Sequence, residues 1–186
     1  MGWKLDNHWD LNVDQCVMIA AQHTSNWDAL YARLALKALG VNVRLTIKDS
    51  YMKLPFGPFV RAMGGIGIDR RVKQAGQERP SMVQLMSDLF KTHPKLVMLV
   101  TPEGTRAKQE QWKTGFYHVA MTAGVPIALA YMDYAKKKTG VGKMIYPTGN
   151  YEQDMAEIMA FYAEINAKHP EKFSVDQRYA NNKYFG

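Results

Sequence analysis

Short apolar runs, separated by longer amphipathic segments, constrain the fold of this chain more than any other feature. Residues 16–21 and 96–100 are continuous apolar runs bounded by polar residues, as expected of strands buried on both faces of a parallel sheet. Residues 44–47, 65–68 and 127–131 are further strand candidates. Strands that alternate with helical segments predict an α/β fold, with a mostly parallel central sheet flanked by helices.

Three segments carry helical patterns. In residues 80–91, Pro80 suits the first helical turn, and apolar side chains recur every three or four residues. Residues 28–39 are apolar nearly all round, so we expect this helix to be largely buried. Residues 153–168 begin with acidic side chains and end with a basic one, which the helix dipole favours, and Pro170 ends the pattern.

The remaining segments give weaker signals. Residues 136–142 combine three lysines with two glycines and are predicted to form a surface loop, and residues 171–186 an irregular tail. A chain of 186 residues with 47% hydrophobic residues can bury a sizeable core. Because no repeat, low-complexity tract or linker interrupts it, we expect one domain over residues 1–186.

His23 and Asp28 stand where the first predicted strand gives way to a helix, with four residues between them. A side chain just past the carboxyl end of such a strand faces the crevice in which open α/β sheets bind ligands. Asp28 can hydrogen-bond one imidazole nitrogen and leave the other basic, as a general base requires. The alternative is that Asp28 caps the helix and His23 is an incidental loop residue.

A glycine-rich block with the sequence GGIGIDR follows at residues 64–70. Its glycines, Gly67 among them, let the backbone approach a ligand closely, and Arg70 can form paired hydrogen bonds to a phosphate or carboxylate. A second block, TPEGTR at residues 101–106, follows the predicted strand 96–100 and should reach the same sheet edge as His23. Such a turn can hold a polyol phosphate group, although Glu-Gly-Thr is also a common structural turn.

The charge distribution suggests an anionic partner. The net charge is +7, and residues 44–79 hold eight basic and three acidic residues, a local +5, which could also be an ordinary solvated face. The lone Cys16 excludes an intrachain disulfide and fits a reducing compartment. No secretory signal is recognised, and the apolar stretch 116–132 falls short of a membrane span, so a soluble or surface-associated protein is expected.

The sequence lacks the common motifs for binding a metal or a nucleotide phosphate. It has no His-Glu-x-x-His or Cys-x-x-Cys metal motif and no phosphate-binding loop of the Gly-x-x-x-x-Gly-Lys-Ser/Thr kind. We therefore predict no metal and no bound cofactor.

Taken together, the blocks resemble the glycerophospholipid acyltransferase family. Its 1-acylglycerol-3-phosphate acyltransferases carry a His-x4-Asp motif, a glycine-rich block that ends in Asp-Arg, a Pro-Glu-Gly-Thr-Arg block and a Val-Pro-Ile block, here at residues 125–127. The order and spacing of these blocks agree with the family pattern over residues 22–127. Lys48 with residues 54–57, and Lys113 with Gly115, also resemble family positions.

The resemblance implies a glycerol-3-phosphate acyltransferase-like fold and an O-acyltransferase activity. His23, oriented by Asp28, would take the proton of an acceptor hydroxyl as that hydroxyl attacks an acyl thioester carried by coenzyme A or acyl carrier protein. No acyl-enzyme is expected. The acceptor would be a lysophospholipid-type alcohol such as 1-acylglycerol-3-phosphate. The implied substrate-binding residues are Lys48, Gly67, Arg70, Glu103, Gly104, Thr105, Arg106 and Pro126.

The chain also departs from the family pattern. Thr101 replaces a usual aromatic residue and Ala107 a frequent serine, which leaves the acceptor open. The N-terminal hydrophobic segment common in the family is not recognised, so a short form is expected. It would be cytoplasmic and peripheral on the inner face of the cytoplasmic membrane, in contact with anionic lipid. The contact would rest on basic charge and on apolar side chains such as Trp3, Trp9, Phe56 or Phe59.

Three alternatives remain open on the sequence. The acceptor could be an amino-lipid or another polar lipid without a phosphate. Water could replace the acceptor at the same base, which would make the protein a thioesterase. The fold could also serve a non-catalytic binder of anionic membranes or nucleic acid, although a nucleic-acid partner is not expected.

Overall fold

A seven-stranded, mostly parallel sheet forms the centre of the computed structural model, which describes residues 2–10, 12–22, 24–53, 55, 57–62, 64–68 and 80–180. The strand order is β1-β7-β6-β2-β5-β3-β4. The strands are β1 (Lys4–Asn7), β2 (Gln15–Ala20), β3 (Val43–Lys48), β4 (Gly65–Ile68), β5 (Leu96–Val100), β6 (Ile127–Asp133) and β7 (Lys138–Ile145).

Five of these strands, β2 to β6, run parallel, whereas β7 pairs antiparallel with β6 and β1 pairs parallel with β7. The sequence-based α/β prediction with a mostly parallel sheet is therefore confirmed. All five predicted strands are present, with ends that shift by at most two residues.

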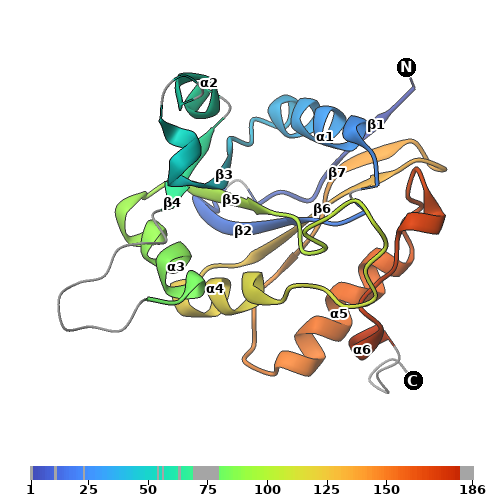
Figure 1. Ribbon diagram of the computed structural model, residues 1–186. Helices are drawn as coiled ribbons and strands as arrows, with labels where there is room; N and C mark the ends of the chain where they lie inside the picture. The colour runs from blue at the N-terminus through green and yellow to red at the C-terminus, as the bar shows by residue number, and fades with distance from the viewer. Residues whose placement is uncertain are drawn as a thin grey trace.

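Helices cover both faces of the sheet. The helices are α1 (Asn26–Ala38), α2 (Gly57–Ala62), α3 (Met82–Thr92), α4 (Gly115–Ala123), α5 (Tyr151–Ala163) and α6 (Gln177–Ala180), with 3-10 turns at Asp49–Met52 and Pro170–Lys172. Helices α1 and α2 lie on one side of the sheet, and α3, α4 and α5 on the other (Figure 1). No helix among the described residues is long and apolar enough to span a membrane.

The two faces of the sheet are packed differently. Along β2, Val17 and Ile19 contribute to the larger core cluster, which includes residues of α4 and α5, whereas Cys16 and Met18 belong to a smaller cluster with Leu36 of α1. This alternation follows from the two-residue period of a strand. Burial raises the pKa of the Cys16 thiol to about 12. The smaller core leaves space beneath α1.

The predicted surface loop at residues 136–142 is wrong in its second half. Only residues 134–137 form a turn, and β7 begins at Lys138. A Cβ at Gly140 would overlap the backbone oxygen of Asp6 in β1, and one at Gly142 would lie 2.5 Å from the ring of Phe161. The glycines are there because neighbours approach the strand closely, not because the chain is a loop.

The edge strand β1 was not predicted, because its sequence is polar. It is held by the Asp6 carboxylate, which accepts a hydrogen bond of 2.6 Å from the Tyr131 hydroxyl and pairs with Lys138 at 3.0 Å. Burial alone would raise the pKa of Asp6, but these two partners keep it below its usual value. Short, charged edge strands of this kind resist pairing with other chains.

Three helix predictions also need correction. Helix α1 is not largely buried, because Trp27 and Leu34 are 54% and 55% exposed on its outer side. Ser81 is the N-cap of α3, so Pro80 precedes that helix. Helix α5 ends at Ala163, and Pro170 opens the 3-10 turn Pro170–Lys172 instead.

The C-terminal segment is only partly an irregular tail. The 3-10 turn Pro170–Lys172 and helix α6 interrupt it, and residues 181–186 lie outside the described part. Helices α2 and α4 had no sequence-based prediction.

We expect Gly140→Ala to destabilise the protein by about 1–3 kcal/mol, the usual cost of a strained backbone position. Gly140 has a φ of 142°, and an added Cβ would also meet the β1 backbone. The control is Gly115→Ala, at the start of α4, where a Cβ meets no atom within 4 Å. Urea unfolding of both variants tests this, and equal stabilities would contradict it.

Candidate active site

The sequence motifs follow the carboxyl ends of parallel strands, which meet at one edge of the sheet. Residue 22 follows β2, and the TPEGTR block begins directly after β5. The last residues of β3 and β4, Lys48 and Ile68, are paired in the same register. His23, Asp69 and Arg70 lie outside the described residues, as does the side chain of Lys48.

The backbone that leaves β2 is held in an unusual conformation. Gln22 has a φ of 68°, which is uncommon for a residue other than glycine. Its N–H donates to the Glu103 carboxylate at 3.0 Å, and its side-chain amide donates to the Ile165 carbonyl at 2.8 Å. Gln22 and Glu103 are both buried. Glu103 therefore positions the residue next to His23, a role that the sequence did not predict.

Asp28 is buried in the first turn of α1 and stabilises the start of the helix. Its Oδ2 accepts hydrogen bonds from the backbone N–H groups of Thr24 at 2.8 Å and Ser25 at 2.6 Å. The Ser25 side chain completes a capping box. These bonds fold the segment that directly follows residue 23 against the carboxylate. The structure therefore shows Asp28 as a helix cap, as the alternative interpretation predicted, while its predicted contact with His23 lies outside the described residues.

Tyr134, the first residue after β6, is a further member of this site. Its hydroxyl donates to Asp28 Oδ1 at 2.6 Å, and its ring makes an edge contact with Trp3. Burial raises the pKa of the Tyr134 phenol well above its usual value, and the neighbouring Asp28 carboxylate raises it further. The phenol therefore stays a proton donor to Asp28, so both carboxylate oxygens have protein donors.

Two buried polar atoms flank residue 23 without a hydrogen-bond partner in the described part of the chain. They are Gln22 Oε1 and the Thr24 hydroxyl. A buried polar group without a partner costs about 1–3 kcal/mol, so each of these two atoms calls for a structural or functional explanation.

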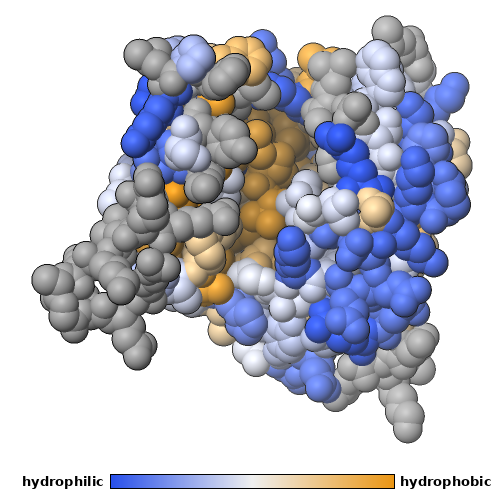
Figure 2. Space-filling view, in the orientation of Figure 1, coloured by the Kyte–Doolittle hydropathy of each residue, from blue (hydrophilic) through white to orange (hydrophobic). Residues whose placement is uncertain are grey.

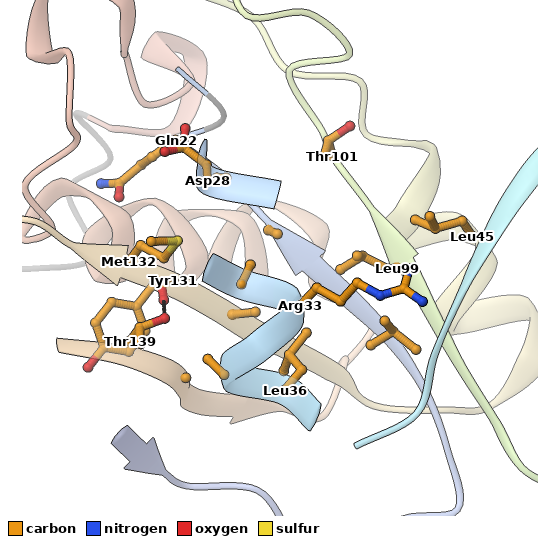
Figure 3. Close-up of a pocket in the computed structure, with 17 residues that line it drawn as sticks. Gln22, Asp28, Arg33, Leu36, Leu45, Leu99, Thr101, Tyr131, Met132 and Thr139 are labelled. Carbon is orange, nitrogen blue, oxygen red and sulfur yellow. Dashed lines mark hydrogen bonds between the residues drawn. The ribbon is translucent and has the colours of Figure 1, made fainter. Parts of the chain in front are cut away.

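An apolar cavity of about 260 Å³ lies between α1 and the sheet. Figure 3 shows Gln22, Asp28 and Thr101 at one end and Leu36 toward the other. Small side chains create the space, because α1 and strands β2 and β6 place alanines along it. The lining alanines are Ala20, Ala21, Ala32, Ala35 and Ala130. Most of its lining is apolar, which suits an apolar ligand.

A second, open pocket of about 420 Å³ is lined by Thr101, Gly104, Thr105 and Arg106. Thr101 lines both spaces, so the polar pocket and the apolar cavity are neighbours at this residue. Lys113 N–H donates to the Pro102 carbonyl at 2.9 Å, which closes the base of the loop.

The ammonium of Lys113 lies over Gly104. An added Cβ at Gly104, whose φ is 66°, would be 2.6 Å from Lys113 Nζ. This places a second cation near Arg106, although Lys113 had not been assigned to the site from its sequence.

Two predicted binding residues do not join this arrangement. Pro126 precedes β6 and its carbonyl accepts from Val17 N–H, at the opposite edge of the sheet. The structure thus gives no support for contact between Pro126 and a substrate at the carboxyl edge. Gly67 lies within β4, where a Cβ would be 2.7 Å from Met52 Cγ and 3.1 Å from Asp49 Oδ1. Close packing explains this glycine without a ligand.

Residues 5–133 match the protein-family model named Acyltransferase. The chain belongs to the acyltransferase family. The resemblance to glycerophospholipid acyltransferases is thereby confirmed, and the chain is an acyltransferase enzyme whose family implies an acyl donor and a lipid acceptor. Neither the curated proteins nor the solved structures compared with the chain gave a match.

The family match covers the polar pocket and every residue that lines the apolar cavity except Thr139 and Gly140, and it ends one residue before Tyr134. Across the described residues, no group of three or more His, Cys, Asp or Glu side chains is placed to hold a metal ion.

We expect Tyr134→Phe to lower the free energy of unfolding by about 1.5–3 kcal/mol, because the lost hydrogen bond has a charged acceptor. The matched control is Tyr146→Phe, whose residue is 59% exposed and should change stability by less than about 0.5 kcal/mol. Denaturant titrations of both variants measure the difference. A Tyr134→Phe protein as stable as the control would remove the phenol from this network.

Proposed function

We propose that this acyltransferase moves a fatty acyl group from coenzyme A or acyl carrier protein to the hydroxyl of a lysophospholipid-type acceptor, such as 1-acylglycerol-3-phosphate. The observation that carries the proposal is that Thr101 lines both an apolar cavity and a polar pocket. An acyl chain in the first and a polar head in the second would bring the thioester and the hydroxyl together beside Gln22 and Thr24, which flank His23.

In the proposed reaction, His23 accepts the proton of the acceptor hydroxyl while the oxygen attacks the thioester carbonyl carbon. The tetrahedral intermediate then collapses, the carbon–sulfur bond breaks, and the thiolate takes the proton from the imidazolium. Asp28 orients His23 and stabilises its charged form. No acyl-enzyme forms, because the acceptor oxygen attacks the thioester directly.

The acceptor head would be bound by cations. Arg106 lines the polar pocket and the Lys113 ammonium lies over Gly104, so a phosphate there would meet two positive charges. Arg70 and Lys48 remain proposed contacts from the neighbouring strands. An acceptor with an amine in place of the phosphate would be repelled by the same charges, which favours the phosphate-bearing class.

His23→Ala should reduce turnover by about 10²–10⁴-fold, the usual contribution of a general base. The assay measures free thiol released from acyl-coenzyme A across a panel of lysophospholipid and amine-lipid acceptors. His118→Ala, an exposed histidine on α4, is the control and should keep wild-type activity. Full activity of His23→Ala would reject the mechanism, and thiol release that no acceptor stimulates would indicate a thioesterase.

Ala35→Leu should lower activity on long-chain thioesters at least about tenfold relative to short-chain ones, because the larger side chain fills the cavity. Ala38→Leu, on the exposed side of the same helix, adds the same atoms outside the cavity and should leave the preference unchanged. Rates with thioesters of increasing chain length provide the measurement. Equal preferences in the two variants would place the acyl chain elsewhere.

A further inference from the structure

Helix α1 exposes an apolar stripe on the side that faces away from the sheet. Trp27, Tyr31 and Leu34 are spaced four and three residues apart, so they lie on one side of the helix. Trp27 and Leu34 are 54% and 55% exposed. On the inner side, Ala35 and Leu36 line the apolar cavity. The helix thus has two apolar sides, and only the inner one is explained by folding.

The stripe is rich in aromatic side chains. The ring centroids of Trp27 and Tyr31 are 6.2 Å apart, and Trp3 stacks on Tyr31 at 5.9 Å. Tryptophan and tyrosine favour the headgroup region of a bilayer, because their rings are apolar and their N–H or O–H groups can stay hydrated. The membrane-facing residues predicted from sequence were Trp3, Trp9, Phe56 and Phe59. In the structure Phe59 is exposed, as are Trp27 and Leu34, which were not among the predicted residues. Trp3 and Trp9 are only partly exposed, and Phe56 lies outside the described residues.

Basic side chains lie beside the stripe. Lys37 is exposed on α1, and Lys168 Nζ lies 6.0 Å from the centre of the Trp27 ring. Helix α2, on the same side of the sheet (Figure 1), exposes Arg61 and Phe59, the latter to 67%. The only acidic residue on α1 or α2 is Asp28, which is buried. The surface is therefore apolar and cationic, which complements an anionic bilayer.

We infer that the outer side of α1, together with Phe59 of α2, docks on the surface of a bilayer that contains anionic phospholipid. The inference rests on the proposed function in one respect, namely that the substrates are lipids. Trp27, Tyr31 and Leu34 insert at headgroup depth, while the basic side chains contact lipid phosphates. Figure 2 shows an apolar hollow on the molecule beside this region. Because α1 is also a wall of the cavity, docking would hold the cavity within one helix diameter of the lipid surface.

The test is co-sedimentation of the full chain with vesicles of phosphatidylcholine alone or mixed with phosphatidylglycerol. Wild type should bind the mixed vesicles, more weakly at high salt. Leu34→Ser combined with Phe59→Ser should weaken binding at least about tenfold, since each change removes an apolar side chain from the contact. Met121→Ser is the control, because Met121 is 42% exposed on α4, on the other side of the sheet.

Activity with short-chain, monomeric substrates separates this inference from the proposed function. The Leu34→Ser, Phe59→Ser double variant should keep wild-type thiol release there, and circular dichroism should show the wild-type fold. The docking surface would be overturned if wild type did not bind the mixed vesicles. It would also be overturned if the double variant bound them as well as Met121→Ser does. Wild type that forms dimers lost in the double variant, without binding vesicles, would assign the stripe to a second copy of the chain and also overturn it.

Discussion

The parallel pairing of β2 with β5 is the constraint on which the candidate active site depends. Its register sets Ile19 opposite Val100, so the segments that leave the two strands emerge side by side. Glu103 can then reach across to the Gln22 N–H and hold a backbone conformation that a glutamine rarely adopts. Burial makes this bond costly to break, since the Gln22 N–H would be left unsatisfied away from water. The position of the turn before His23 therefore depends on a contact between residues 81 apart in sequence.

Much of the fold could be predicted because buried parallel strands leave a clear signal. Continuous apolar runs identified β2 and β5, and the weaker candidates for β3, β4 and β6 followed from the alternation of strands and helices. Strand β7 was missed because Gly140 and Gly142 resemble loop residues, whereas they allow β1 and Phe161 to pack closely. The burial of α1 was overestimated because an apolar sequence gives no information on what covers each side of a helix.

The site was predictable only where residue types form a pattern. The sequence placed the TPEGTR block at the same sheet edge as residue 22, which the strand order bears out. It could not predict the role of Tyr134, because a single tyrosine after a strand belongs to no motif. It also could not predict the position of Lys113 over Gly104, because that position depends on how the loop closes. The apolar cavity was equally hidden, since scattered alanines acquire meaning only when α1 is packed on the sheet. Pro126 had motif support, yet it precedes β6 at the opposite edge of the sheet.

The two apolar sides of α1 also affect how the protein behaves in water. An exposed row of large apolar groups makes molecules adhere to one another and lowers solubility. A net charge of +7 opposes this through mutual repulsion between copies. Salt screens this repulsion, whereas it does not weaken the attraction between apolar surfaces. The colloidal stability of the protein in a lipid-free solution should therefore decline as ionic strength rises. The same positive charge that keeps copies apart would draw each of them toward a negatively charged surface.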